Sequence, residues 1–421
     1  MKRKETLKHF SMPAAMMLAV LLPASVSAQE QGTTGDLTWK VEALDYNVYV
    51  SENGNPVAKL ACRLTISGNG EMPDYKNVGY DDVNYRNIYD YPWYKFQNIA
   101  EAVIENGVKS IGTNSMAGLS NLKKVSLPSS IESIGESTFS ECYNLSTINF
   151  PEGLKSIGSC AFGWLDNLRE VHLPSTLTVI GDDVWRDAFR GNNISKLTVA
   201  EGNPLYDSRD NCNAVILTAT NEVFIGTPVT VIPTSVKTIG DFAFINNHNL
   251  KNYEIPDQVT TINRFAFSNC DRMTKMTVGK GVTSIGKGGI GLGCDMLDDV
   301  YFYANPNNLT WEYYEYVYDS GDMFKKDKST KFHVPGNYVT LWQTKFPNLN
   351  VTLVGDLPDG PLTGDPDVNG DGKTDAEDVV ALTEYLAGTA TGISESTADV
   401  NKDGKVDIAD VVALINIIHG K

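Results

Sequence analysis

Apolar side chains recur along the middle of the chain with a constant 23-residue period. The repeated mark is an Ile-Gly pair (Ile-Asn in one copy), with another large apolar residue four positions after its second member. The pairs begin at Ile111, Ile134, Ile157, Ile180, Ile239, Ile262 and Ile285. A unit of this length can bury its apolar residues only by stacking on its neighbours, so the period predicts a solenoid with a shared core.

A short strand precedes most of the pairs. Leu122–Pro128 has the form L-x-x-V-x-L-P, and Leu168–Pro174 repeats it. Alternation along the strand points Val125 and Leu127 inward and Lys124 outward, and the proline ends the pairing. The apolar residues that follow the pairs are expected at equivalent buried positions: Met116, Phe139, Phe162, Trp185, Phe244, Phe267 and Ile290.

One coil carries an insertion. The interval from Gly181 to Gly240 exceeds two repeats by 13 positions. Val215–Leu217 and Val223–Ile225 flank Asn221 within this interval. Two short apolar runs around a turn residue favour a hairpin, so we expect one near residues 204–228, projecting from the solenoid.

The repeat frame resembles a known family. Leu122–Cys142 shows the full pattern L-x-x-V-x-L-P-x-x-I-x-x-I-G-x-x-x-F-x-x-C, which is similar to the BspA-like, Treponema-type leucine-rich repeat. The resemblance covers roughly residues 99–302, and Leu64–Gly70 with Pro92–Tyr94 looks like the N-terminal cap of that family. It implies a mainly β, horseshoe-shaped solenoid at 99–354, with a β-rich cap at 29–98 and a C-terminal cap from about 303.

A second internal repeat lies at the C-terminus. Asp367–Leu382 and Asp399–Leu414 agree at 12 of 16 positions, and both begin D-V-N-x-D-G-K-x-D-x-x-D. Calcium takes six to eight oxygen ligands, and loops of this type supply them from positions 1, 3, 5, 7, 9 and 12, with glycine at position 6. The sequence therefore predicts two Ca²⁺ sites. Their ligands would be Asp367, Asn369, Asp371, the Lys373 carbonyl, Asp375 and Asp378 in the first, and Asp399, Asn401, Asp403, the Lys405 carbonyl, Asp407 and Asp410 in the second.

Each loop is expected to lead into one exit helix. Residues 355–366 contain Pro358, Pro361 and Pro366 and should form a linker, because proline forbids a helix before the first loop. The apolar residues expected to pack the two helices together are Val379, Val380, Leu382, Leu386, Val411, Val412, Leu414, Ile415 and Ile418.

The tail, residues 367–421, resembles a type I dockerin, a small all-α module of paired calcium loop-helix units. The resemblance implies docking onto a cohesin module of another protein. In that family, loop positions 10 and 11 and the exit helix contact the partner. The loop positions are Ala376, Glu377, Ile408 and Ala409 here, and they lack the Ser/Thr and the near-identical halves of the common pattern.

The N-terminus predicts export. Residues 1–28 combine basic residues such as Lys2 and Arg3, the short apolar run Ala14–Leu22 and a small-residue cleavage site at Val26–Ala28. This run is too short to span a bilayer, so we expect a secreted, extracellular or cell-surface protein without a membrane span. The net charge of −17 disfavours nucleic acid as a partner. The six cysteines include no C-x-x-C pair, and we expect buried free thiols.

No catalytic motif emerges, and we expect a non-catalytic interaction protein. There is neither H-E-x-x-H nor G-x-S-x-G, and carboxylates fall on repeat-surface or calcium positions. The outward strand positions are expected to form a concave face that binds a partner, with protein favoured over glycan, although their polarity also serves solubility. They include Lys124, Ser126, Asn149, Glu170, His172, Lys196, Glu254, Lys275 and Tyr301.

The alternative is a carbohydrate-binding accessory subunit of a polysaccharide-degrading assembly, because dockerins as a family accompany such assemblies. A cluster of aromatic residues could stack on sugar rings, although its place just after the last coil favours a capping role instead. They are Trp311, Tyr313, Tyr314, Tyr316 and Tyr318.

Overall fold

The structure is a computed structural model of the 421-residue chain. It describes residues 28–181, 188–312, 324, 330–347, 349, 351–358, 367–369, 373–390, 393, 395–401 and 405–418. The predicted signal peptide therefore lies outside the described residues except for Ala28. No helix in the described part of the chain is long and apolar enough to cross a membrane.

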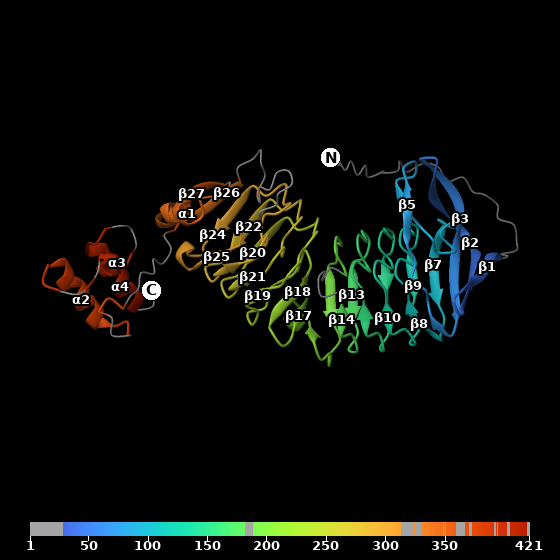
Figure 1. The fold of residues 1–421 in the computed structure, drawn as a ribbon, viewed down its shortest axis with the longest axis horizontal. Helices are drawn as coiled ribbons and strands as arrows, with labels where there is room; N and C mark the ends of the chain where they lie inside the picture. Colours follow the sequence, from blue (N-terminus) through green and yellow to red (C-terminus); the bar gives the residue numbers. More distant parts are fainter. Residues whose placement is uncertain are drawn as a thin grey trace.

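The predicted repeats form a β-solenoid (Figure 1). The L-x-x-V-x-L strands build one row of sheets. The first sheet contains β1 (Ala28–Thr34), β2 (Leu37–Glu52), β3 (Asn55–Gly68), β7 (Ile99–Ile104), β9 (Lys124–Ser126) and β11 (Thr147–Ile148). The row continues in β13 (Glu170–Leu173) and β15 (Lys196–Val199), then in β20 (Asn252–Ile255), β22 (Lys275–Val278), β24 (Asp299–Phe302), β26 (Thr330–Pro335) and β27 (Val351–Leu357).

The Ile-Gly pairs build a second row of shorter strands. One sheet contains β4 (Gly70–Glu71), β8 (Val108–Ile111), β10 (Ser133–Ile134), β12 (Ser156–Ile157) and β14 (Val179–Ile180). The other contains β16 (Tyr206–Asp207), β17 (Ala214–Leu217), β18 (Glu222–Gly226), β19 (Thr238–Ile239), β21 (Thr261–Ile262), β23 (Ser284–Ile285) and β25 (Thr310–Trp311).

The sequence period becomes a parallel register between coils. Ile134 pairs with Ile111 on one side and with Ile157 on the other, so equivalent residues lie one above another. All three side chains are buried. The predicted solenoid is thus confirmed.

A column of aromatic rings runs through the interior. Phe162 stacks on Phe139 with ring centroids 5.3 Å apart, and on Phe189 at the same distance. The repeat frame predicts Trp185 in this place, but Phe189 holds it, so that assignment is wrong. Four extra residues in this coil shift the apolar position along the chain, and Trp185 itself lies outside the described residues.

The predicted hairpin exists but does not project. β17 pairs with β18 antiparallel, and β18 pairs with β19 parallel, so the hairpin belongs to the second sheet. Val215 packs into the N-terminal core cluster, whereas the adjacent Ile216 packs into the C-terminal one. The hairpin is the seam that joins the two cores, which explains why both of its faces are apolar.

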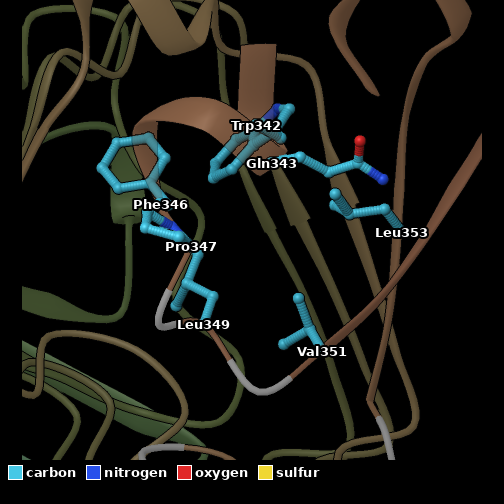
Figure 2. Close-up of a pocket in the computed structure, with 7 residues that line it drawn as sticks. All are labelled: Trp342, Gln343, Phe346, Pro347, Leu349, Val351 and Leu353. Carbon is cyan, nitrogen blue, oxygen red and sulfur yellow. The ribbon is translucent and has the colours of Figure 1, made fainter. Parts of the chain in front are cut away.

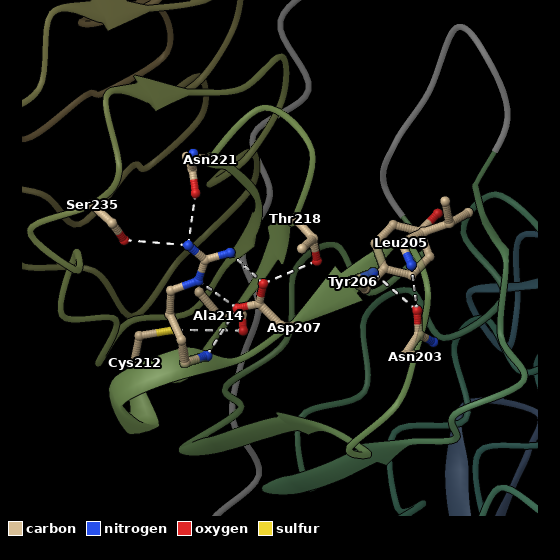
Figure 3. A network of polar contacts seen from close by, with 10 residues as sticks. Asn203, Leu205, Tyr206, Asp207, Cys212, Ala214, Thr218, Asn221 and Ser235 are labelled. Carbon is tan, nitrogen blue, oxygen red and sulfur yellow. Dashed lines mark hydrogen bonds and ion pairs between the residues drawn. The ribbon is translucent and has the colours of Figure 1, made fainter.

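A polar network ties the insertion down at this seam. Arg209 donates to Asp207 Oδ1 at 2.8 Å and to Asn221 Oδ1 at 2.7 Å, while the Thr218 hydroxyl donates to Asp207 at 3.0 Å (Figure 3). These bonds link the segment before β17 to the turn between β17 and β18. The network closes the insertion against the solenoid.

None of the six cysteines forms a disulfide, and five of the six are buried as expected, whereas Cys160 is only half-buried. Three occupy corresponding places in their coils, and each thiol lies near the carbonyl oxygen of a residue in the preceding coil: Cys142 with Met116 at 3.2 Å, Cys270 with Phe244 at 3.2 Å and Cys294 with Phe267 at 3.1 Å. These thiols serve as buried coil-to-coil contacts.

Aromatic residues close both ends of the solenoid. At the N-terminal end Trp93 is buried beside Trp39 and its indole N–H donates to the Ser115 carbonyl at 2.9 Å. A small hairpin follows the first strands, formed by β5 (Asn77–Asp81) and β6 (Arg86–Tyr89). At the other end the helix α1 (Val339–Lys345) places Trp342 against Phe302, with centroids 4.7 Å apart.

Trp311 belongs to this C-terminal closure. It is only 5% exposed and packs against Phe302, Phe332 and Trp342. Trp311 therefore has no open ring face for sugar stacking, and its burial agrees with the expected capping position. The other aromatic residues of that cluster, Tyr313, Tyr314, Tyr316 and Tyr318, lie outside the described residues.

The last strand of the solenoid runs past the expected boundary. β27 continues to Leu357, whereas the prolines predict a linker that begins at residue 355. Parallel pairing with β26 extends the strand, with Pro335 opposite Leu357.

The tail contains α2 (Ala376–Leu386), α3 (Glu395–Ala398) and α4 (Ile408–Ile418). Its core includes Leu382, Val411 and Leu414, in agreement with the expected helix packing. The expectation is wrong for Val380, Leu386, Val412 and Ile415, which are exposed. Both α2 and α4 are amphipathic rather than buried all round, and the outer face of each keeps large aliphatic residues.

Candidate calcium loops and interaction surfaces

The first loop of the tail is closed by Asp378. This carboxylate is fully buried in the first turn of α2. Its Oδ1 accepts the backbone N–H of Asn369 at 3.1 Å, and its Oδ2 accepts that of Asp375 at 2.8 Å. Asp375 in turn caps α2 by accepting the N–H of Glu377 at 2.9 Å. One side chain therefore joins the beginning of the loop to its end.

Asp410 does the same in the second loop. Its two carboxylate oxygens accept the N–H groups of Asn401 at 2.9 Å and Asp407 at 2.8 Å, and it is also fully buried. Asp407 caps α4 through the N–H of Ala409 at 2.8 Å. The two loops thus share a geometry as well as a sequence.

The donor set of both loops fits calcium. Their oxygen-only ligands suit a hard cation, and a fully buried carboxylate is costly unless donors or a cation offset its charge. Asp371 and Asp403, which would complete the two sets, lie outside the described residues. Within the described ranges, no group of three or more His, Cys, Asp or Glu side chains is arranged to hold a metal.

The dockerin resemblance implies that loop positions 10 and 11 contact the cohesin. All four of these residues are exposed: Ala376, Glu377, Ile408 and Ala409. Ile408 is 69% exposed and begins a line of aliphatic residues along α4, followed by Val412 and Ile415. Spacings of four and three residues put these side chains on one helix face. We call Ile408, Val412 and Ile415 the α4 stripe.

The repeat makes the two tail helices unequal on this face. When the two loop-helix units are aligned, Ala376 and Thr383 stand where the second unit has Ile408 and Ile415, and only the middle valine is kept, as Val380. The α4 side is therefore the more apolar of the two. The sequence alone does not identify the α4 stripe, because its apolar pattern fits a helix-helix contact equally well.

The predicted partner-binding residues of the solenoid point to solvent. We call this side of the L-x-x-V-x-L strands the polar strand face. Tyr301 on it is half-buried, and the exposed members are Lys124, Ser126, Asn149, Glu170, His172, Lys196, Glu254 and Lys275. They are spread over three sheets, so the structure does not gather them into one cluster.

A compact group lies at the C-terminal end of the polar strand face. The ring of His333 stacks on that of Tyr301 at 4.4 Å, and the Lys275 ammonium lies 4.2 Å from the centroid of the Tyr301 ring. His333 Nδ1 is 2.8 Å from Asp356 Oδ2, and its Nε2 is 3.1 Å from Asp299 Oδ1. Contact with both neighbours leaves little of the Tyr301 face for a sugar ring.

Sequence reasoning misses His333 and Asp356 as part of this group. The coil between Tyr301 and His333 is longer than the regular repeat, so the period does not align these two residues. The parallel pairing of β24 with β26 places His333 directly opposite Tyr301. Only that register reveals the group.

A pocket of about 310 Å³ lies between α1 and β27 (Figure 2). Its lining residues are Trp342, Gln343, Phe346, Pro347, Leu349, Val351 and Leu353. None of these side chains can act as a general acid, base or nucleophile near neutral pH. The pocket is a feature of the cap rather than a reaction site.

Stacked coils with polar outer strands and a paired loop-helix tail define a multidomain protein of the interaction class. The chain belongs to the family of BspA type leucine rich repeat proteins, whose model matches six copies over residues 86–208 and 221–351. Residues 365–419 match the dockerin type I domain. Proteins of both kinds are typically non-catalytic, and dockerin type I domains bind calcium.

Several solved bacterial structures are similar to this chain. A leucine-rich repeat protein from Eubacterium ventriosum is 24% identical, with a TM-score of 0.44, over 65% of this chain and 74% of that one. The pneumococcal vaccine antigen PcpA is 16% identical over 79% of this chain and 99% of its own, at a TM-score of 0.40.

A leucine rich cell surface protein from Faecalibacterium prausnitzii is 17% identical over 69% of this chain and 96% of its own, at a TM-score of 0.33. No curated protein matches the chain. The stacked coils, together with the match to the BspA type leucine rich repeat family, establish the fold.

Proposed function

We propose that this chain is an exported adaptor that binds a protein through its solenoid and docks through its calcium-loaded tail onto a cohesin. The observation that carries the docking half is the α4 stripe, which lies on a domain that matches the dockerin family. Exposed aliphatic side chains at this density favour burial in a protein interface.

Calcium in both loops would fix the start of each exit helix. Asp378 and Asp410 sit in the first helical turns and close their loops, so a cation held by the remaining oxygens would lock loop and helix together. The chemistry supplied by the metal is charge neutralisation among clustered carboxylates. Within the chain, the hydrogen bonds of Asp410 hold the start of α4 in place and so orient this helix toward the partner.

The inequality of the two helices favours one docking orientation. A partner that buries Ile408 and Ile415 would meet Ala376 and Thr383 if the tail were rotated to present α2 instead. Each large aliphatic side chain buried is worth about 1.5–3 kcal/mol. The α4 orientation is therefore preferred.

For the solenoid, a protein ligand on the polar strand face is favoured over a glycan. Trp311 is buried, and Tyr301 is covered by Lys275 and His333, so the aromatic support for sugar binding is weak. The alternating charges Lys275, Asp299 and Lys331 lie in register across three strands and suit a polar peptide surface. Export rests on the signal at residues 1–28.

The docking proposal is tested with the chain lacking residues 1–28 and a panel of purified cohesins, measured by surface plasmon resonance with calcium or with EGTA. At least one cohesin should bind only with calcium. Ile408→Ser with Val412→Ser should weaken that binding at least tenfold, whereas Val380→Ser on α2 should change it less than threefold. Binding that survives EGTA, or that Val380→Ser weakens equally, contradicts the proposal.

A further inference from the structure

The N-terminal cap carries a second exposed apolar surface, at the opposite end of the solenoid from the dockerin. We call it the cap tyrosine patch and define it as Tyr49, Val78, Tyr80, Val83, Tyr85 and Tyr143. Tyr85 is 79% exposed, and all but Tyr143 are more than half exposed. Tyrosine is enriched at protein interfaces because it combines a large apolar ring with a polar tip.

The tip of the β5–β6 hairpin holds two of these residues in a set conformation. Asp81 Oδ1 accepts the N–H groups of Val83 at 3.1 Å and Asn84 at 3.0 Å. Asn84 Oδ1 then accepts the Ser51 hydroxyl at 3.0 Å and the N–H of Gly54 at 3.3 Å, which fastens this tip to the β2–β3 hairpin. A lone two-stranded hairpin is marginal in water, so these anchors are what order it.

Tyr85 is in the left-handed region of the backbone, with φ of 55°. A bulky residue rarely adopts this conformation, and the cost persists only where the surroundings impose it. The anchored turn imposes it here, and the ring is left in solvent. A backbone that is already fixed in this way adds little ordering cost when a partner binds.

The rest of the patch is fastened to the first coils. Tyr80 pairs with Asn87 across the hairpin, and the Asn87 amide donates to Glu141 Oε1 at 2.7 Å. Glu141 lies two positions before Tyr143 in the chain. This bond brings the hairpin and the coil that bears Tyr143 together.

Two carboxylates, those of Glu141 and Asp166, lie near Tyr143 at the edge of the patch. Burial raises the pKa of Tyr143, and the nearby carboxylates of Glu141 and Asp166 raise it further. Burial also raises the pKa of Glu141. The cation of the hairpin, Arg86, lies 3.6 Å from Asp81 and so is engaged within it.

Two properties of the patch identify the kind of partner. Carboxylates beside tyrosine rings favour Lys or Arg side chains, which also gain from cation–π contact. Val78 and Val83 gain only from burial against aliphatic groups, which a sugar does not offer. We propose that the cap tyrosine patch binds a basic segment of another protein in which Arg or Lys alternates with aliphatic residues.

The test is fluorescence anisotropy of the full mature chain with three labelled ten-residue peptides, which alternate Arg with Leu, Glu with Leu, or Arg with Ser. The Arg–Leu peptide should bind at least tenfold more tightly than either of the others. Tyr80→Thr combined with Tyr85→Asn should raise its Kd at least tenfold, since both replacements suit the local backbone. Tyr303→Ala, an exposed tyrosine outside the patch, is the matched control and should leave Kd unchanged.

A second variant guards against misfolding as the cause. Glu141→Gln keeps an acceptor for Asn87 but removes the charge, so it should raise Kd about threefold or more and reduce the dependence of binding on salt. The proposal is overturned if the Glu–Leu peptide binds equally well, if the patch variants bind as the parent does, or if Tyr303→Ala weakens binding to the same degree. Cohesin binding by the tail is unaffected in any of these outcomes.

Discussion

Asp378 and Asp410 occupy the same place in the two tail loops, and both are fully buried while each accepts two backbone N–H groups. The repetition shows that the loops are two copies of one structural unit. It also places one buried carboxylate in each copy, where backbone N–H groups already satisfy both of its oxygens.

Removing one of these carboxylates should remove one calcium site. Asp378→Ala deletes both loop-closing bonds and a proposed metal ligand, and the same change at Asp410 affects only the second loop. Isothermal titration calorimetry should give a stoichiometry of two for the parent chain and one for each variant. Glu384→Ala, an exposed acidic residue outside the loops, should keep a stoichiometry of two. A single-site parent would contradict the assignment.

The aromatic column should be a main source of solenoid stability. Phe162 is fully buried between Phe139 and Phe189, so Phe162→Ala leaves a cavity and should lower the free energy of unfolding by about 3–5 kcal/mol. Urea denaturation followed by circular dichroism measures the change. A loss below about 1 kcal/mol would show that the column is not tightly packed.

The seam should control whether the two cores unfold together. Val215 and Ile216 face different cores, so the pair of changes Val215→Ala and Ile216→Ala weakens both sides of the hairpin. We expect calorimetric unfolding of the solenoid to separate into two transitions. Val231→Ala, at a 71% exposed valine in the same coil region, should leave the profile unchanged. An unchanged profile in the seam variant would contradict the seam role.

Much of this architecture could be predicted from the sequence because the repeat period itself carries the information. A constant spacing fixes which residues lie one above another, and Ile134 between Ile111 and Ile157 follows directly. The hairpin itself could be predicted from the sequence, but its position in the fold could not. The sequence does not show that two different cores cover its two apolar faces. Trp185 was misassigned because four extra residues break the frame.

The candidate sites also differ in how far the sequence alone identifies them. The calcium ligands proposed for Asp367–Asp378 follow from loop spacing alone, and they stay a prediction. The α4 stripe could not be identified in this way, because the spacing of apolar residues does not tell whether a helix face packs on another helix or lies in solvent. The cap tyrosine patch depends on Asn84 and Asn87 contacting residues distant in sequence, which no local pattern reveals.

The buried thiols should respond to pH in a defined direction. Burial raises the pKa of Cys62 to about 11 against an ordinary value of 9.0, with the Asn98 amide opposing the shift. The unfolded thiol therefore loses its proton first, so the free energy of unfolding falls as pH rises from about 9 to about 11. Cys62→Ala should reduce this decline, as measured by urea denaturation at pH 8 and pH 11. An equal decline in the variant would contradict it.

The most direct test of the account is differential scanning calorimetry of the chain lacking residues 1–28, in 1 mM calcium and in excess EGTA. With micromolar affinity, each bound calcium adds about 4 kcal/mol at that concentration, which is large for a tail of this size. We predict that EGTA lowers the transition of the tail by more than 10 °C or abolishes it, while the solenoid transition stays in place. Superimposable profiles in the two buffers would contradict a calcium-dependent docking module.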